Sequence, residues 1–251
     1  MHNGPLTRRQ ALWAVLLSSP TTSALCGMTV LELHRVWGFA TTQIHVLVTK
    51  GGRVLAVPNV DITVHETRTF PTEDVRLFDD FRATLPRRAV IDAASWAPDD
   101  FTAARVLVAG VQQIRVPPML LREQVQKRTK LPRRRLLLLL CNDLEGGAQA
   151  LSEIEFLRFC VRHGLPRPIL QVRHDSAGRR RYLDATFRRR DSSVFHVEVD
   201  GGIHLKLEVR SKDDIKDNDA KLDRKLVLRY TSFAIYTDQP DAVRQITRAF
   251  G

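Results

Sequence analysis

The residues best suited to chemistry are three carboxylates in one stretch of alternating sequence. Two strand patterns flank a loop that we place at Asp191. In the antiparallel hairpin that results, Asp184 lies opposite Glu198, with Cβ atoms about 5 Å apart. Asp200 lies two residues beyond Glu198 and therefore shares its face. The opposite face of the hairpin is apolar throughout, so a slip of one residue would mix the two faces, and the register is well specified.

Three acidic side chains on one small patch repel one another and raise a pKa unless a cation is present. Mg²⁺ takes carboxylate oxygens at about 2.1 Å and keeps several of its waters, so it would relieve this repulsion. We therefore expect Mg²⁺, or Mn²⁺, bound by Asp184 and Glu198, with Asp200 beside them. His204 follows a pair of glycines and lies close enough to accept a proton from water at such a site.

Arginines surround the first of these carboxylates, at positions Arg179, Arg180, Arg181, Arg188, Arg189 and Arg190. They could serve only as counter-ions that stabilise the sheet, with no metal present. The same guanidinium groups could instead hold a phosphate backbone, because arginine binds phosphate through paired hydrogen bonds. For this second interpretation the expected nucleic-acid contacts are Arg180, Arg181, Arg188 and Arg189.

Glu155 has two interpretations. With Ser152 it fits a capping box, in which its carboxylate only closes the start of a helix. Alternatively, it is an outer ligand of the metal or of a water molecule, because it neighbours the buried stripe of that helix and could reach the rim of the sheet.

Two lysines lie one helical turn apart further along the chain. Lys212 and Lys216 could meet phosphate from the same helix face. Four aspartates interleave with them, so a solvated face of mixed charge is the alternative. Arg229, in a later strand, is a further candidate for the site.

The composition favours a polyanionic partner. The chain has 251 residues, a formal net charge of +11 and 43% apolar residues, which is normal for a folded protein. Thirty-one of its 39 basic residues are arginine, a bias that codon usage alone could produce. An arginine-rich solvated surface is therefore the alternative to nucleic-acid binding.

A cytoplasmic protein without a membrane segment is expected. Three cysteines are too few and too scattered for a disulfide framework or a zinc knuckle, and Cys141 and Cys160 are expected in the core. The longest apolar run, from Leu136 to Cys141, is far below the roughly twenty residues that span a bilayer. Residues 7–12 resemble a twin-arginine export signal, but the apolar stretch that follows is short and interrupted by Pro20.

The pattern of elements predicts an α/β or α+β fold in two domains, 1–146 and 147–251, divided at a glycine pair. In the first domain we expect helices at 7–18, 27–36, 87–97, 101–115, 117–127 and around 136–146, and strands at 43–49 and 60–67. In the second we expect helices at 150–163, 212–223 and 240–249, and strands at 167–174, 181–187, 194–200 and 226–236.

Residues 150–236 resemble a bacterial domain related to very-short-patch-repair endonucleases, within the PD-(D/E)XK restriction-endonuclease-like superfamily. The matching pieces are SEIEFL at 152–157, YLDATF at 182–187, VEVDGGIH at 197–204 and LVLRY at 226–230. The resemblance implies a mixed sheet flanked by helices and a Mg²⁺ site that cuts phosphodiester bonds.

The resemblance also implies roles for individual residues. Asp184 and Glu198 match the metal carboxylates, Glu155 matches a glutamate on a helix, and His204 matches the histidine that ends the motif. The superfamily pattern has lysine where this chain has Asp200, which leaves the general base to His204 or to a more distant group. The related subfamily shares that aspartate, so the replacement does not imply inactivity.

Residues 25–97 resemble the AbiEi-type antitoxin region, through LCGMTVLELHRVWGF at 25–39, QIHVLVT at 43–49 and RRAVIDAASWA at 87–97. Such proteins usually begin with a winged-helix DNA-binding module. Only about 24 residues precede the match, so we expect no complete winged helix here, unless the true start codon lies upstream.

These observations predict a Mg²⁺-dependent endonuclease that acts on DNA. The alternative is a non-catalytic nucleic-acid-binding or antitoxin-type regulatory protein that reuses a nuclease fold. A third interpretation is a protein-interaction role, in which the first domain neutralises a toxin or another protein partner.

Overall fold

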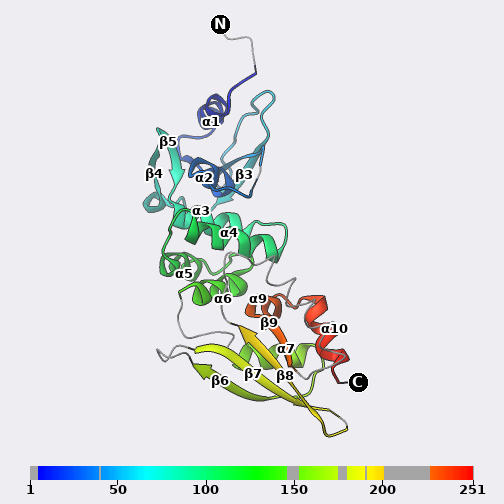
Figure 1. Cartoon of the computed structure of the whole chain (residues 1–251). Helices are drawn as coiled ribbons and strands as arrows, with labels where there is room; N and C mark the ends of the chain where they lie inside the picture. The colour runs from blue at the N-terminus through cyan, green and yellow to red at the C-terminus, as the bar shows by residue number, and fades with distance from the viewer. Residues whose placement is uncertain are drawn as a thin grey trace. The chain divides into compact units, whose positions relative to one another are not determined.

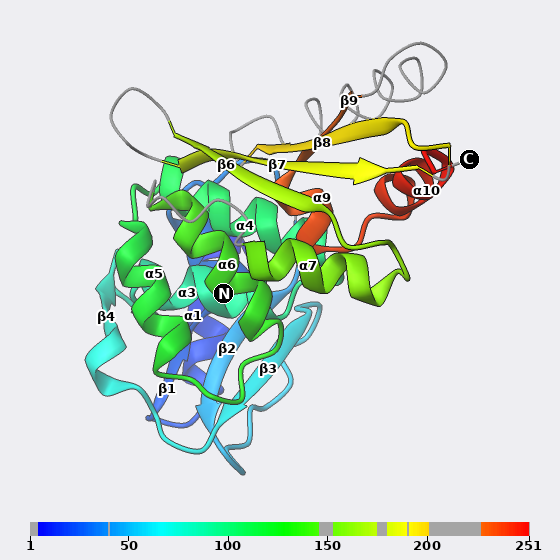
Figure 2. The ribbon, with the colours of Figure 1, turned by 90° about the horizontal axis from the view of Figure 1, so that it is seen from below.

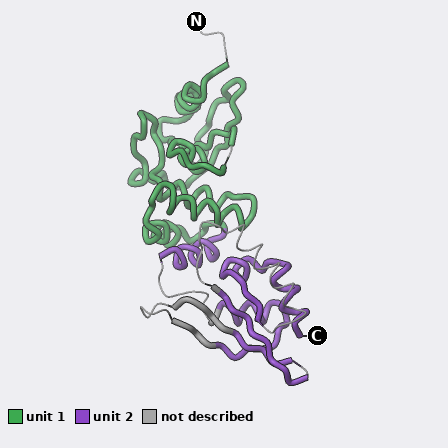
Figure 3. The backbone as a smooth tube through the Cα atoms, viewed as in Figure 1, with its two compact units in different colours: residues 1–132 green, residues 133–251 purple. Residues whose placement is uncertain are grey.

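The computed structural model describes residues 5–39, 41–145, 153–174, 180–189, 191–200 and 227–250, and only the backbone at 153–154, 171–174, 180–184 and 200. Helices and strands mix along the chain, so the fold is α+β, as the sequence predicts (Figure 1). The chain forms two compact units, residues 1–132 and 133–251, which we call unit 1 and unit 2 (Figure 3). None of the described helices is long and apolar enough to cross a membrane.

Unit 1 is built on a five-stranded mixed sheet. Its strands are β1 (Ser23–Leu25), β2 (Ile44–Thr49), β3 (Ile62–Thr67), β4 (Val75–Phe78) and β5 (Phe81–Thr84), in the spatial order β3-β2-β1-β5-β4. The central strand β1 is antiparallel to β2 and parallel to β5. β2 and β3 run parallel, and β4 pairs antiparallel with β5. The sequence predicts β2 and β3 and misses β1, β4 and β5.

The helical segments described in unit 1 are α1 (Arg8–Leu17), α2 (Gly27–Leu33), η1 (Thr72–Asp74), α3 (Pro86–Ser95), α4 (Asp100–Gln112) and α5 (Pro118–Gln126). Their starts follow local chemistry. A capping box between Thr7 and Gln10 begins α1, and the Asp99 carboxylate accepts the Thr102 N–H at 2.6 Å to begin α4. Proline occupies the first turn of α3 and of α5, where its missing N–H is not needed.

Unit 2 contains α6 (Arg134–Leu144), α7 (Glu153–Arg162), β6 (Ile169–His174), β7 (Arg180–Arg188), β8 (Val194–Asp200), β9 (Val227–Thr231), α9 (Ser232–Tyr236) and α10 (Pro240–Arg248). The four strands that the structure describes in this unit form one sheet in the order β6-β7-β8-β9. The first three pair antiparallel, and β9 joins β8 in parallel. Figure 2 shows the long β7–β8 hairpin beside α7 and α10.

The core of unit 2 lies on one face of this sheet. Phe156 and Phe159 of α7 pack in the same buried cluster as Ala185 of β7, Val197 of β8 and Ile246 of α10. The cluster also contains an aromatic group, in which the rings of Phe187 and Phe195 stack with centroids 5.1 Å apart and Phe250 meets both edge-on. The helices therefore cover the face that carries the odd-numbered residues of β7 and β8.

Two boundaries differ from the sequence prediction. The expected strand at 226–236 ends at Thr231, because the Thr231 hydroxyl accepts the Ala234 N–H at 3.2 Å and starts α9. The units divide after Pro132, ahead of α6, whereas the sequence placed the division at 146. The physical reason is Asp143 of α6, which accepts hydrogen bonds from Ser232 at 2.7 Å and Tyr236 at 3.3 Å and so holds α6 to α9. The charged helix expected at 212–223 lies outside the described residues.

Candidate functional site

The β7–β8 hairpin has the register that the sequence predicts. Asp184 pairs with Glu198, Tyr182 with Asp200 and Thr186 with His196. The turn is centred on Asp191, whose carboxylate accepts both the N–H and the hydroxyl of Ser193, at 2.9 and 2.6 Å. These local bonds lower the pKa of the Asp191 carboxyl and fix the turn. The expected pairing of Asp184 with Glu198 is therefore confirmed at the level of the backbone.

The face of the sheet opposite the core carries the acidic positions. Ala185, Val197 and Val199 are fully buried against the helices. Since successive residues of a strand alternate between faces, positions 184, 198 and 200 belong to the other face. For Asp184 and Asp200 the structure describes the backbone and the register, and their side chains lie outside the description.

Glu198 has a cationic partner on the neighbouring strand. The parallel register of β8 and β9 sets Glu198 beside Arg229, and the Arg229 Nε donates to a Glu198 carboxylate oxygen at 2.9 Å. The Glu198 side chain is 31% exposed and Arg229 is 60% exposed, so the pair lies at the surface of the sheet. This ion pair is the contact that best supports Arg229 as part of the site. Sequence reasoning kept Arg229 only as a secondary candidate, because a parallel pairing leaves no local signal.

One further polar pair lies on this face. The Thr186 hydroxyl and His196 Nδ1 are 3.0 Å apart across the hairpin. In the register the row formed by Thr186 and His196 is next to the row formed by Asp184, Glu198 and Arg229. On β7 and β8, therefore, two consecutive rows are polar, and the second row continues into the apolar Ile169 of β6 and Val227 of β9.

Glu155 lies in the first turn of α7, with its side chain only 11% exposed. Its carboxylate forms ion pairs with Arg135 of α6 and with Arg158, the latter at 2.6 Å. Both of these ion pairs join Glu155 to arginines on helices. Ser152, the expected capping partner, lies outside the described residues.

The predicted nucleic-acid contacts divide into three groups. Arg188 is exposed at the end of β7, as a phosphate contact requires. Arg189 is instead engaged within the fold, because its Nε donates to the Ala249 carbonyl and its guanidinium lies 5.5 Å from the centre of the Phe195 ring. Arg180 and Arg181 belong to β7, with side chains outside the description, and Lys212, Lys216 and His204 lie outside the described residues altogether.

Buried groups near α9 shape the rest of unit 2. Burial raises the pKa of the Tyr236 hydroxyl, and the neighbouring Asp143 carboxylate raises it further. Sequence reasoning missed Asp143, which no local motif marks. Cys160 is buried as expected, and burial raises the pKa of its thiol to about 12, so it remains an unreactive part of the core.

The donor types at the hairpin suit a hard divalent cation. Carboxylate oxygens are the ligands that Mg²⁺ and Mn²⁺ prefer, and Asp184 faces Glu198 in the register. Among the side chains that the structure describes, no group of three or more His, Cys, Asp or Glu residues could hold a metal ion. A metal at the hairpin would therefore depend on the Asp184 side chain, together with Glu198.

No family model matches this chain, and neither a curated protein nor a solved structure matches it.

Proposed function

We propose that unit 2 is a metal-dependent endonuclease domain that hydrolyses phosphodiester bonds in DNA. The observation that carries the proposal is the register of β7 and β8, which pairs Asp184 with Glu198 and puts Asp200 on the same face. Two facing carboxylates on a polar sheet face are a common basis for binding Mg²⁺ in enzymes that cut phosphodiesters. The sequence resemblance to very-short-patch-repair endonucleases supports the same function.

In this proposal Asp184 and Glu198 hold Mg²⁺, or Mn²⁺, and a bound metal would supply Lewis-acid activation of water and charge stabilisation at phosphate. Arg229 restrains the Glu198 carboxylate through its hydrogen bond at 2.9 Å and adds positive charge beside it. Arg188, exposed at the end of β7, is placed to contact a phosphate of the DNA backbone. His204 is proposed as the group that accepts a proton from the attacking water.

The test combines metal binding with cleavage. We expect the wild-type protein to bind Mn²⁺ by calorimetry, with DNA present and absent, and to cut DNA with Mg²⁺. Asp184→Asn and Glu198→Gln should each reduce cleavage at least a hundredfold. The matched control is Asp241→Asn, which removes an exposed carboxylate from α10 and should cleave at the wild-type rate. Equal cleavage by the wild type and the Asp184 variant would overturn the proposal.

One observation favours a second candidate function. Arg229 already neutralises Glu198, so the carboxylate pair has a counter-ion without any metal. We propose as the alternative a non-catalytic nucleic-acid-binding or antitoxin-type regulatory protein. It predicts DNA binding that depends on salt but is insensitive to Mg²⁺, with no cleavage by any variant.

A further inference from the structure

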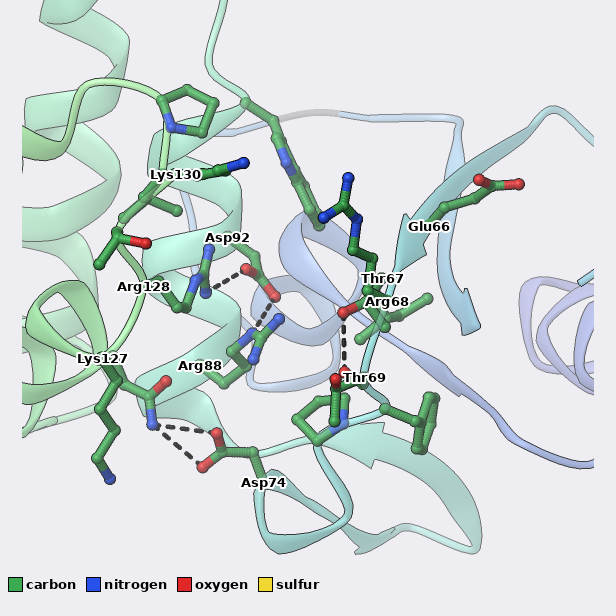
Figure 4. Close-up of a pocket in the computed structure, with 18 of the residues that line it drawn as sticks. Glu66, Thr67, Arg68, Thr69, Asp74, Arg88, Asp92, Lys127, Arg128 and Lys130 are labelled. Atoms are coloured by element: carbon green, nitrogen blue, oxygen red, sulfur yellow. Dashed lines mark hydrogen bonds and ion pairs between the residues drawn. The ribbon is translucent and has the colours of Figure 1, made fainter. Parts of the chain in front are cut away.

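Unit 1 contains a charged pocket that the proposed nuclease site does not use. Its volume is about 710 Å³, and it lies between the end of β3, helix α3 and the segment that follows α5. Its lining combines basic side chains with a few apolar ones, including Phe70 and Trp96. Figure 4 shows this pocket and the polar residues around it.

The base of the pocket carries more positive than negative charge. Asp92 of α3 is fully buried, and its two carboxylate oxygens accept hydrogen bonds from Arg88 Nε at 2.8 Å and Arg128 Nη1 at 2.6 Å. Two guanidinium groups thus share one carboxylate. Within the described part of the chain, the remaining N–H groups of these two arginines have no protein acceptor, although each guanidinium carries five donors.

Two further basic side chains lie at the mouth of the pocket. Arg68, just after β3, and Lys130, after α5, are exposed, and neither forms an ion pair with any residue that the structure describes. In Figure 4 their side chains extend toward the space above Arg88 and Arg128, whereas Lys127 points away from it. The four basic groups therefore approach one region from three different elements.

The lining carboxylates do not cancel this charge. Asp74 is 3% exposed and is already held by Arg87 at 2.8 Å and by the Gln124 amide at 3.1 Å. Glu66 points away from the four basic groups in Figure 4, and its carboxylate accepts the Gly51 N–H at 3.4 Å. The remaining lining carboxylate, Glu73, is exposed on η1.

We propose that this pocket binds the phosphate of a nucleotide, with Arg68, Arg88, Arg128 and Lys130 as its ligands. Arginine holds phosphate oxygens through its planar fork, and lysine adds a point charge. The volume falls within the range of about 300–1,000 Å³ typical of small-molecule sites, so there is room for more than a phosphate alone. The same chemistry fits a free nucleotide or a nucleotide within a nucleic-acid strand.

The test measures binding of ADP, adenosine and a 5′-phosphorylated single-stranded oligonucleotide to the full chain by calorimetry. EDTA is present throughout, so that the metal site of unit 2 cannot contribute. The site variant is Arg68→Gln with Lys130→Gln, two exposed positions whose loss should leave the thermal midpoint unchanged. The matched control is Lys50→Gln with Arg53→Gln, which removes the same charge from exposed side chains that do not line the pocket.

We expect the site variant to bind ADP at least tenfold more weakly than the wild type, the control variant to stay within threefold, and adenosine to bind to neither. If only the oligonucleotide binds, and the site variant weakens it likewise, the source of the phosphate is a nucleic-acid strand. The proposal would be overturned if the wild type bound neither ADP nor the oligonucleotide. It would also be overturned if the site and control variants bound them with equal affinity. Equal affinity for ADP and adenosine would overturn it as well. None of these outcomes depends on cleavage, so the two proposals can fail separately.

Discussion

Asp74 and Asp92 of unit 1 are carboxylates enclosed by the fold, and arginine partners hold each of them. Removing a carboxylate from water costs several kcal/mol, and the ion pairs with partly buried guanidinium groups offset this cost. Asp92 has two such partners, so its negative charge also offsets the repulsion between the guanidinium groups of Arg88 and Arg128. The contribution of Asp92, Arg88 or Arg128 to stability therefore depends on the presence of the other two.

Asp92→Asn keeps the shape of the side chain and removes its charge. We expect it to lower the free energy of unfolding by about 3 kcal/mol, because two largely buried guanidinium groups lose their counter-ion. Urea denaturation would measure the loss. The control is Asp79→Asn, which breaks an exposed ion pair with Arg9 and should change stability by less than about 0.5 kcal/mol. Equal effects of the two substitutions would contradict this account.

A stack of three rings gives unit 1 a pH dependence. The His65 ring lies parallel to Trp96, with centroids 3.4 Å apart, and its Nε2 is 2.9 Å from Nδ1 of His45. Burial, together with repulsion from His45, lowers the pKa of His65 from 6.5 to about 4. Between about pH 6.5 and pH 4 the unfolded chain therefore binds a proton that the folded chain excludes.

Stability should consequently fall as the pH drops through that window and be constant above it, as far as His65 is concerned. We expect the thermal midpoint of the wild type to fall between pH 7.5 and pH 5.0. His65→Gln should show a smaller fall, since it removes one of the groups that titrate. The pKa of His45 is also lowered by burial, so some pH dependence should persist. Parallel pH profiles for the wild type and the variant would exclude His65 as a cause.

At the scale of elements, local sequence determines some features and leaves others open. The register of β7 and β8 was predictable because the two strands adjoin in sequence, alternate strictly and meet at a turn set by Asp191. The pairing of Glu198 with Arg229 needed the parallel β8–β9 contact, which joins residues far apart in the chain. The strands β1, β4 and β5 were missed because three or four residues are too few to show a period.

The charged pocket of unit 1 could not be predicted from the sequence, because its residues are also far apart in the chain. Arg68, Arg88 and Arg128 come from segments with no shared motif, and only the folding of α3 against α5 and β3 brings them together. In contrast, the end of β9 and the start of α9 could have been predicted from the local sequence. Thr231 ends the strand and Ser232 follows it, and a threonine in that place is a typical helix start.

Gly27, at the start of α2, allows that helix to approach α3 closely. Its φ is +50°, and a Cβ there would lie 2.9 Å from the Trp96 ring. We expect Gly27→Ala to lower the thermal midpoint more than Gly51→Ala. The Gly51 variant carries only the left-handed backbone cost of about 1–2 kcal/mol, because nothing lies within 4 Å of its Cβ. Equal shifts would show that Trp96 moves aside without cost.

At the scale of the whole molecule, both units are basic. Residues 1–132 carry 16 basic and 11 acidic side chains, and residues 133–251 carry 23 and 17. The net charge of +11 is therefore spread over the chain. This distribution agrees with the two proposed phosphate-binding sites, one in each unit.

If both proposals hold, affinity for DNA should fall steeply as salt rises, because each neutralised phosphate releases counter-ions. With about three phosphate contacts, we expect at least a tenfold loss of affinity between 50 and 200 mM salt. Fluorescence anisotropy with a labelled duplex would measure it, in EDTA to prevent cleavage. An affinity that does not change with salt would argue against nucleic acid as the partner.

The strand β1 has a consequence for how unit 1 folds. It has only three residues, Ser23–Leu25, yet it joins β2 on one side to β5 on the other, and its side chains are at most 3% exposed. The pairs β2–β3 and β4–β5 can join into one sheet only when β1 lies between them. Folding of unit 1 should therefore be all-or-none, and hydrogen exchange should give the amide protons of β2 and β5 one common free energy of opening.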